Sequence, residues 1–183
     1  MVRNVLKKLW REEIKMLKDA QKDQQTITTD GKQTRTLLEG VKQKEVSNII
    51  TRNGVTTELF RPEWAVGPDK IGHMIHAILR AGAISAWHMH EHQMDTFFVT
   101  NGAIKLVLFD DRANSSTRGE INVLHLSRMR PTLITVPPGI WHGLQNLENL
   151  ESSFINYFDR PYDYSNPDEW RLPSDTDNIP YRF

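Results

Sequence analysis

The sequence predicts an all-β fold in which many short strands close into a sandwich or barrel. From about residue 38 onward, β-rich runs such as HMIHAIL, DTFFVT, AIKLVLF and TLITV alternate with turn pairs, among them Asn53-Gly54 and Asn101-Gly102. Many short strands separated in this way are typical of all-β domains and not of folds built from β-α-β units. The 183 residues are enough for one such domain with a real core and an appendage.

One amphipathic helix is predicted before the strands, over about residues 3–20. Its apolar side chains recur at three- and four-residue steps with Lys and Arg between them, as expected for one face of a helix. This apolar stripe consists of Val2, Val5, Leu6, Leu9, Trp10, Ile14 and Leu17. We expect the stripe to pack on the barrel or on a second subunit. Acidic residues on the polar face weigh against binding to a membrane surface.

The chain on either side of the strands is predicted to be irregular. Residues 21–36 are polar with few apolar side chains, so we expect a linker or mobile arm there. The segment after Arg160 is rich in Pro, Asp and Tyr and is expected to wrap the barrel as an ordered loop. We therefore predict two regions: the helix with its linker over 1–37, and the barrel with its C-terminal tail over 38–183.

The composition weighs against several classes of partner and site. Lys plus Arg and Asp plus Glu each number 23, so the net charge is zero. A protein without a net positive field is not expected to bind nucleic acid or an anionic membrane. The absence of cysteine rules out disulfides and thiolate ligands, so any metal must be bound through nitrogen and oxygen. There is no apolar leader or long apolar run, and we expect a cytoplasmic protein.

The most informative motif is G-x5-H-x-H-x4-D-x6-G, at Gly82, His88, His90, Asp95 and Gly102. The two histidines are two residues apart, so on a strand both side chains point to the same face, here the barrel interior. Asp95 follows across a short turn. The motif therefore predicts a strand, a turn and a second strand that bring three potential ligands together.

A second cluster, P-x-G-x2-H-x3-N, lies at Pro137, Gly139, His142 and Asn146. After this tight turn, the histidine can approach the first motif from a neighbouring strand. Three imidazoles and one carboxylate on one side of an ion leave coordination positions open, as in catalytic metal sites. The alternative is an interior lined by hydrogen-bonded histidines without an ion. The predicted ligands of a divalent metal (Fe, Mn, Ni, Co or Zn) are His88, His90, Asp95 and His142.

Together these motifs resemble those of the cupin superfamily, whose fold is a jelly-roll β-barrel. Within it, the chain is similar to the dTDP-4-dehydrorhamnose 3,5-epimerase family over about residues 38–183. The segment TELFRPEW (57–64) resembles the family's R-G-x-x-x-E-x-F segment, and VPPGIWHGL (136–144) its I-P-x-G-x-x-H-G-F turn. NPDEWRLPSDTDNIPY (166–181) is similar to its closing tail.

The resemblance implies a metal-independent epimerase that removes and returns protons beside a ketone on a nucleotide-linked sugar. By motif, the general base falls on His88, its carboxylate partner on Asp175, and a second functional histidine on His142. Such a base needs a pKa near the working pH, which a carboxylate partner tunes. The resemblance places substrate contacts at Glu58, Phe60, Arg61 and Asn156.

Several positions depart from the family pattern. His90 replaces a glutamine, Asp95 replaces the lysine that steadies the enolate oxyanion, and Asn156 replaces the acid tyrosine. Ser85-Ala86 replaces an Arg-Gly pair that contacts the substrate. A carboxylate where an oxyanion forms is unfavourable unless a cation lies between them. We infer that a metal ion has taken over the role of the lysine, or that the epimerase chemistry has been lost.

Three hypotheses follow for the function. The first is a metal-dependent isomerase or epimerase that acts on a keto-sugar, such as a nucleotide-sugar, or on a similar carbonyl compound. If all four ligands bind metal, His88 cannot also be the base, and Glu58, Tyr157 or a metal-bound hydroxide would have to act. The second is an iron-dependent oxygenase, and the third is a non-enzymatic sugar- or metal-binding protein. Because exposed edge strands are a liability, we also expect a homodimer.

Overall fold

The computed structural model describes residues 17–183, and the chain divides into two units, Met1–Thr36 and Leu37–Phe183. The predicted helix over residues 3–20 falls largely outside the described part. Its last positions, 17–20, form a turn closed by a hydrogen bond from the Ala20 amide to the Leu17 carbonyl. The division between the units lies one residue before the predicted boundary. Within residues 17–183, no helix is long and apolar enough to cross a bilayer.

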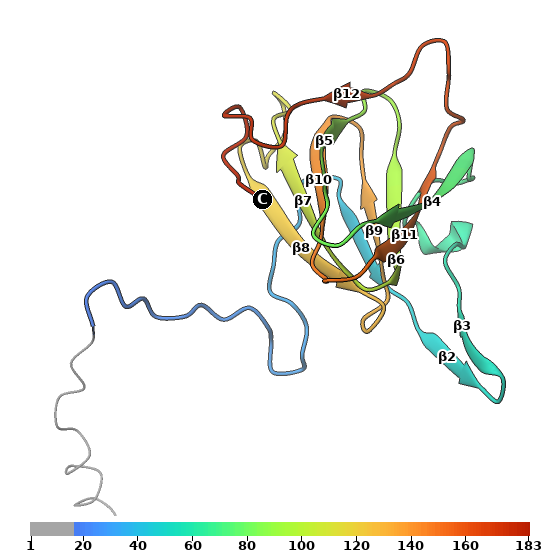
Figure 1. The fold of residues 1–183 in the computed structure, drawn as a ribbon, viewed down its shortest axis with the longest axis horizontal. Helices are drawn as coiled ribbons and strands as arrows, with labels where there is room; N and C mark the ends of the chain where they lie inside the picture. Colours follow the sequence, from blue (N-terminus) through green and yellow to red (C-terminus); the bar gives the residue numbers. More distant parts are fainter. Residues whose placement is uncertain (1–16) are drawn as a thin grey trace, which may run out of the picture. The chain divides into compact units, whose positions relative to one another are not determined.

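The second unit is a jelly roll of two five-stranded antiparallel sheets, which confirms the predicted fold class (Figure 1). The first sheet runs in the order β1 (Lys42–Glu45), β9 (Thr132–Val136), β6 (Asp95–Asn101), β11 (Ser152–Phe158) and β4 (His73–Leu79). The second sheet runs in the order β12 (Trp170–Arg171), β5 (Ile84–Met89), β10 (Ile140–Asn146), β7 (Ala103–Asp110) and β8 (Ile121–Ser127). A separate hairpin of β2 (Asn48–Thr51) and β3 (Gly54–Thr57), and the short 3-10 helix η1 (Pro62–Trp64), lie between β1 and β4 in the chain.

The core follows from the two-residue alternation of side chains along each strand. On β7, Ile104, Leu106 and Leu108 point between the sheets into the main apolar cluster, whereas Val107 and Phe109 point outward. The main cluster also includes Phe97, Leu144 and Phe154, which form part of the wall of a cavity. The same strands therefore carry both the packed core and the site.

The outer faces of both sheets are covered by irregular chain. Residues 59–71 cover Tyr157 on the outside of the first sheet, where the rings of Phe60 and Tyr157 meet edge to face. The C-terminal tail covers the second sheet, and the Phe183 ring lies 5.0 Å from that of Trp87. This tail also supplies β12, which pairs with β5 and so brings the segment before it to the cavity.

The turn before β10 needs a glycine. Gly139 has φ 81°, a conformation that L side chains rarely adopt, and a Cβ there would lie 2.9 Å from Arg112 Cδ. Its amide donates a hydrogen bond of 2.7 Å to the carbonyl of His90. This turn therefore joins the start of β10, which carries His142, to the end of β5.

Candidate active site

A cavity of about 700 Å³ lies between the sheets. Its wall includes five of the residues singled out by the sequence: His88, His90, Asp95, His142 and Asn156. The C-terminal segment before and within β12 closes one side of the cavity with charged and aromatic side chains. These are Arg160, Tyr162, Asp163, Tyr164, Asp168, Glu169 and Arg171.

Three of the predicted metal ligands form a compact trio. His90 follows β5, Asp95 begins β6 and His142 lies in β10, and one potential ligand atom from each lies within 4.8 Å of the others. The Asp95 Oδ2 atom is 3.6 Å from the Nε2 atoms of both His90 and His142. These separations leave room for an ion between the donor atoms at ordinary ligand distances of about 2.0–2.2 Å.

The surrounding hydrogen bonds hold the trio ready to bind a cation. His142 Nδ1 donates to the carbonyl of Ile140 at 3.1 Å, and His90 Nδ1 donates to the carbonyl of Asp168. Because a carbonyl oxygen can only accept, each Nδ1 carries hydrogen and each Nε2 faces Asp95. A hydrogen bond of this kind at the second ring nitrogen is the usual support of a metal-binding histidine.

The charges of the trio also suit a cation. Burial lowers the pKa of His142 to about 4, so this imidazole is neutral and free to coordinate at physiological pH. Burial opposes protonation of His90 as well, but the nearby carboxylate of Asp95 outweighs it and raises the His90 pKa. Burial would raise the pKa of Asp95, but the two histidines outweigh it and keep the pKa low. The site therefore holds a buried carboxylate that attracts positive charge.

His88 is the one predicted ligand that the structure does not bring into the trio. Its Nδ1 is 3.0 Å from Glu169 Oε1 and its Nε2 is 3.1 Å from Ser85 Oγ. A carboxylate only accepts, so Nδ1 carries hydrogen and Nε2 has the free electron pair. Burial lowers the pKa of His88, partly offset by Glu169, so the ring is a neutral base. Ser85 itself is not among the residues that line the cavity.

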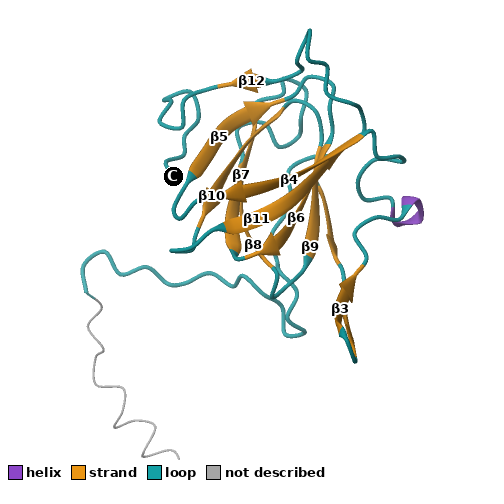
Figure 2. Cartoon of the chain, turned by 45° about the vertical axis from the view of Figure 1, so that its right-hand side comes forward, coloured by secondary structure: helices purple, strands orange, loops and turns teal. Residues whose placement is uncertain are grey.

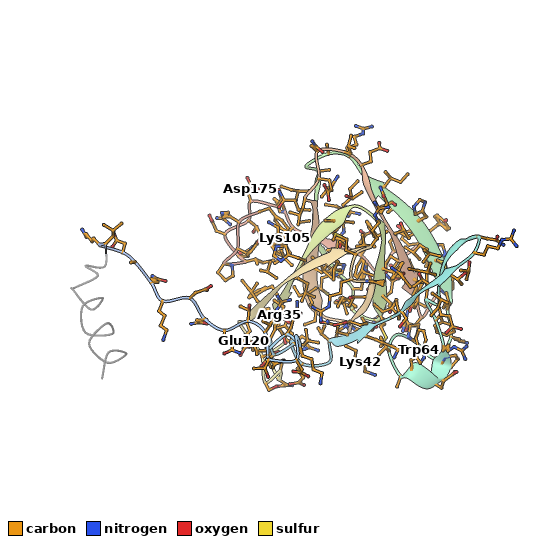
Figure 3. The ribbon with its side chains drawn as sticks, turned by 90° about the horizontal axis from the view of Figure 1, so that it is seen from below. Arg35, Lys42, Trp64, Lys105, Glu120 and Asp175 are labelled. Atoms are coloured by element: carbon orange, nitrogen blue, oxygen red, sulfur yellow. The ribbon has the colours of Figure 1, made fainter. Side chains whose placement is uncertain are left out.

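The carboxylate partner of His88 is Glu169 and not Asp175, so the predicted dyad is wrong in its second member. Asp175 is exposed on the C-terminal tail at the margin of the barrel (Figure 3). Glu169 is brought to the cavity because it directly precedes β12, in which Arg171 pairs with His88. The Arg171 guanidinium also donates to Glu169. The sequence signal for Glu169 and its neighbour Asp168 is weak, because acidic residues are common in a polar tail.

Three predicted substrate contacts do not line this cavity in the described chain. Glu58 and Arg61 form an exposed ion pair at 2.6 Å, and Phe60 packs on the outside of the first sheet. Tyr157, considered above as an alternative proton-transfer residue, is also on that outer face. Its hydroxyl donates to the Leu59 carbonyl at 3.0 Å, and burial raises its pKa to about 12.

Asn156 does face the cavity, because it alternates with Tyr157 along β11. Its Nδ2 donates to Asp95 Oδ2 at 3.1 Å. Its Oδ1 is buried without a hydrogen-bond partner in residues 17–183. A buried polar atom without a partner is costly, so this oxygen is suited to accept a hydrogen bond from a bound molecule or to face a cation.

The fold and the cavity define a cupin-type protein whose barrel holds a histidine–carboxylate pair next to an imidazole–carboxylate trio. The sequence model of dTDP-4-dehydrorhamnose 3,5-epimerase matches residues 35–180. The chain therefore belongs to the dTDP-4-dehydrorhamnose 3,5-epimerase family, and it is an enzyme of the sugar-epimerase type.

Two relatives and one solved structure show the extent of the similarity. The chain is 32% identical over 142 residues to the probable low-salt glycan biosynthesis epimerase Agl13 of Haloferax volcanii, covering 75% of this chain and 89% of that protein. It is 30% identical over 147 residues to the spore coat polysaccharide biosynthesis protein SpsL of Bacillus subtilis, covering 80% and 97%. The crystal structure of a dTDP sugar isomerase from Desulfovibrio desulfuricans superimposes with a TM-score of 0.74 at 25% identity, covering 80% and 94%.

Proposed function

We propose that this protein epimerises a 4-keto sugar linked to a nucleotide, with His88 as the base and a divalent cation held by His90, Asp95 and His142. One observation carries the proposal: the base and the trio open onto the same cavity. The ring centroids of His88 and His142 are 5.8 Å apart, and both residues line that cavity. A proton acceptor and a site for positive charge are therefore within the span of a single carbonyl group and its neighbouring carbon.

His88 performs the proton transfer in this proposal. Its Nε2 electron pair takes the proton from the carbon next to the ketone, while the electrons of the broken C–H bond move to the carbonyl oxygen. Glu169 accepts from Nδ1 and stabilises the imidazolium that forms. The Ser85 hydroxyl must give up its bond to Nε2 as the substrate enters. Return of a proton to the opposite face of the carbon completes the inversion.

The trio is proposed to stabilise, through its cation, the negative charge that develops on the carbonyl oxygen. When bound, a divalent cation supplies Lewis-acid stabilisation of this charge. The nitrogen and oxygen donors fit Fe, Mn, Ni, Co or Zn, and three protein ligands leave further coordination positions open. Without a cation, the carboxylate of Asp95 would oppose the charge that develops during the reaction.

Asn156 is proposed to orient the sugar. Its free Oδ1 can accept a hydrogen bond from a sugar hydroxyl, and its Nδ2 is already bonded to Asp95. An amide does not supply a proton as a tyrosine hydroxyl does. The proton returned to the opposite face must then come from water or from another group in the cavity.

Deuterium exchange tests the proposed function. The protein is purified without added metal, its metal content is measured, and it is incubated in D2O with dTDP-4-keto-6-deoxyglucose before and after treatment with a chelator. We expect exchange at a carbon next to the ketone, its loss after chelation, and its recovery with one divalent metal. The His88→Asn variant should keep the metal but lose exchange by about 10²–10⁴-fold.

Two results would contradict epimerisation, and a third would contradict only the role of the cation. Absence of exchange with every divalent metal would exclude the epimerisation of such keto-sugars. Oxygen consumption by the Fe(II)-loaded protein, without exchange, would favour the oxygenase hypothesis. Retention of full exchange after complete removal of metal would leave the epimerase but exclude the role of the cation.

We also propose that the protein forms a homodimer through the β2–β3 hairpin. This hairpin projects from the barrel (Figure 2), and Ile49, Ile50 and Val55 on it are more than half exposed. Adjacent exposed apolar side chains on a hairpin that is isolated from both large sheets favour an interface. Glu58 and Arg61 follow β3 in the chain, so such a dimer would bring them close to the interface.

A further inference from the structure

Asp168 accepts hydrogen bonds from four consecutive residues beside the trio, 90–93, although it has no role in the proposed reaction. We propose that Asp168 is a positioning residue, which holds the cation ligand His90 and the base His88 in register with each other. This inference rests on the proposed function for its meaning, but its contacts are independent of it. Asp168 lies within the segment 166–181 that resembles the family's closing tail, but no role was predicted for it from the sequence.

The side chain of Asp168 fixes the turn between β5 and β6. Its Oδ1 accepts from the amide of Glu91 at 2.8 Å, and its Oδ2 accepts from the amides of His92 and Gln93 at 2.9 Å each. These three donors lie between His90 and Asp95, the first two members of the trio in the chain. A carboxylate that accepts three backbone donors defines the path of this turn more strictly than solvent could.

The same turn then fixes the carboxylate of the trio. Gln93, whose amide is bound by Asp168, donates its side-chain Nε2 to Asp95 Oδ1 at 2.9 Å. Asn156 holds the other oxygen, Oδ2. Asp168 is therefore connected to Asp95 through a single intermediate residue.

The main chain of Asp168 acts on His90 directly. Its carbonyl accepts from His90 Nδ1, which leaves Nε2 as the nitrogen that faces Asp95. In metal sites, partners of this kind set the tautomer and ring direction of the ligand, and their loss typically weakens metal binding by about 10–100-fold. One residue thus fixes both the turn after His90 and the ring of His90.

Glu169, the residue after Asp168, connects this segment to the proposed base His88. Its carboxylate receives Nδ1–H of His88 at 3.0 Å. The pairing of Trp170 with Met89 and of Arg171 with His88 fixes the segment on its other side. A displacement of Asp168 would therefore move the partners of His90 and His88 together, which is why we assign it a role in alignment.

Substitutions of Asp168 test whether this residue aligns His90 and His88 or only stabilises the fold. Asp168→Asn keeps the shape but places one amide group against backbone donors, and Asp168→Ala removes all three bonds. Asp177→Asn is the matched control, because Asp177 is an exposed carboxylate of the same tail whose ion pair is with Arg182. The readouts are the His90 tautomer from long-range 1H–15N NMR at alkaline pH, the affinity for Co²⁺, and kcat and KM for exchange.

We expect the Asp168 variants to show mixed His90 tautomers and a Co²⁺ affinity about 10–100-fold lower. Exchange should lose kcat with KM little changed, and the control should match the wild type in every readout. If a variant has a lower melting temperature but keeps the single wild-type tautomer, Asp168 is only structural and the inference is wrong. If Asp168→Ala does not fold, Asp168→Asn alone decides.

The tautomer readout also keeps this inference distinct from the proposed function. If the wild type catalyses no exchange with any divalent metal, the proposed function fails. A change of the His90 tautomer in Asp168→Asn would still support positioning, and an unchanged tautomer would still refute it.

Discussion

At the scale of single residues, two histidines in one cavity suit different chemical roles because their neighbours differ. His142 is almost fully buried, and burial lowers its pKa to about 4, so it suits coordination. His88 has a carboxylate at one nitrogen and an electron pair at the other, so it suits proton transfer. The spacing of the motifs brought both to the cavity, because strand periodicity sets which face a side chain occupies. Spacing could not separate their roles, since these depend on Glu169, 81 residues further along the chain than His88.

Substitution of the two candidate carboxylates distinguishes the partner of His88. Glu169→Gln keeps the size of the side chain but removes the charge that stabilises the imidazolium. We expect the exchange rate to fall on the order of 10²-fold, the lower end of what a positioned base contributes. Asp175→Asn, at an exposed position, should exchange like the wild type. Steady-state exchange kinetics check both variants, and the reverse ranking would restore the pairing predicted from the sequence.

At the scale of elements, the loop between β7 and β8 supports the turn that leads into β10, the strand of His142. The buried carboxylate of Asp110 accepts from Arg112 Nε at 2.9 Å, Ser115 Oγ at 2.6 Å and Thr117 Oγ1 at 2.7 Å. Arg112 in turn packs beside Gly139 at the start of β10. The use of Arg112 as a support depends on packing between segments that are distant in sequence, which local sequence patterns do not encode.

Asp110→Asn should lower the free energy of unfolding by about 3 kcal/mol, because it leaves Arg112 without its charged partner. Burial alone would raise the pKa of Asp110, but the hydrogen bonds from Arg112, Ser115 and Thr117 outweigh it and hold the pKa well below its usual range. The contribution is therefore complete above the unfolded-state pKa of about 3.9 and is lost as the pH falls below that value. Urea unfolding at neutral and acidic pH measures this, and the variant should depend less steeply on pH.

At the scale of the whole molecule, alternation of short strands and turns was sufficient to predict an all-β domain, and the family resemblance predicted the jelly roll. The sheet order and the cavity depend on long-range pairing, such as that of β6 with both β11 and β9, which local patterns do not encode. For the same reason, Glu58 and Arg61 were expected at the substrate, whereas they lie outside the cavity of their own chain.

If the protein dimerises through the β2–β3 hairpin, one substitution on that hairpin should halve its mass in solution. Ile50, 82% exposed on the β2–β3 hairpin, is changed to Asp, which places a charge in the proposed apolar interface. We expect the wild type to sediment as a dimer and Ile50→Asp as a folded monomer. Leu150→Asp, at a 74% exposed position in the loop between β10 and β11, should remain dimeric. A wild type that is monomeric at all concentrations in analytical ultracentrifugation would exclude this assembly.

The late position of Asp168 and Glu169 in the chain has a consequence for the order in which the site can be assembled. His90, Asp95 and His142 leave the ribosome before these two acids do, but residues 37–183 form one compact unit, and a domain generally folds as a unit. We therefore expect the barrel to close around the proposed cation ligands only when the segment that carries Glu169, the partner of His88, is also present. The proposed cation site and the proposed base are then completed in the same step, when the C-terminal segment pairs with β5.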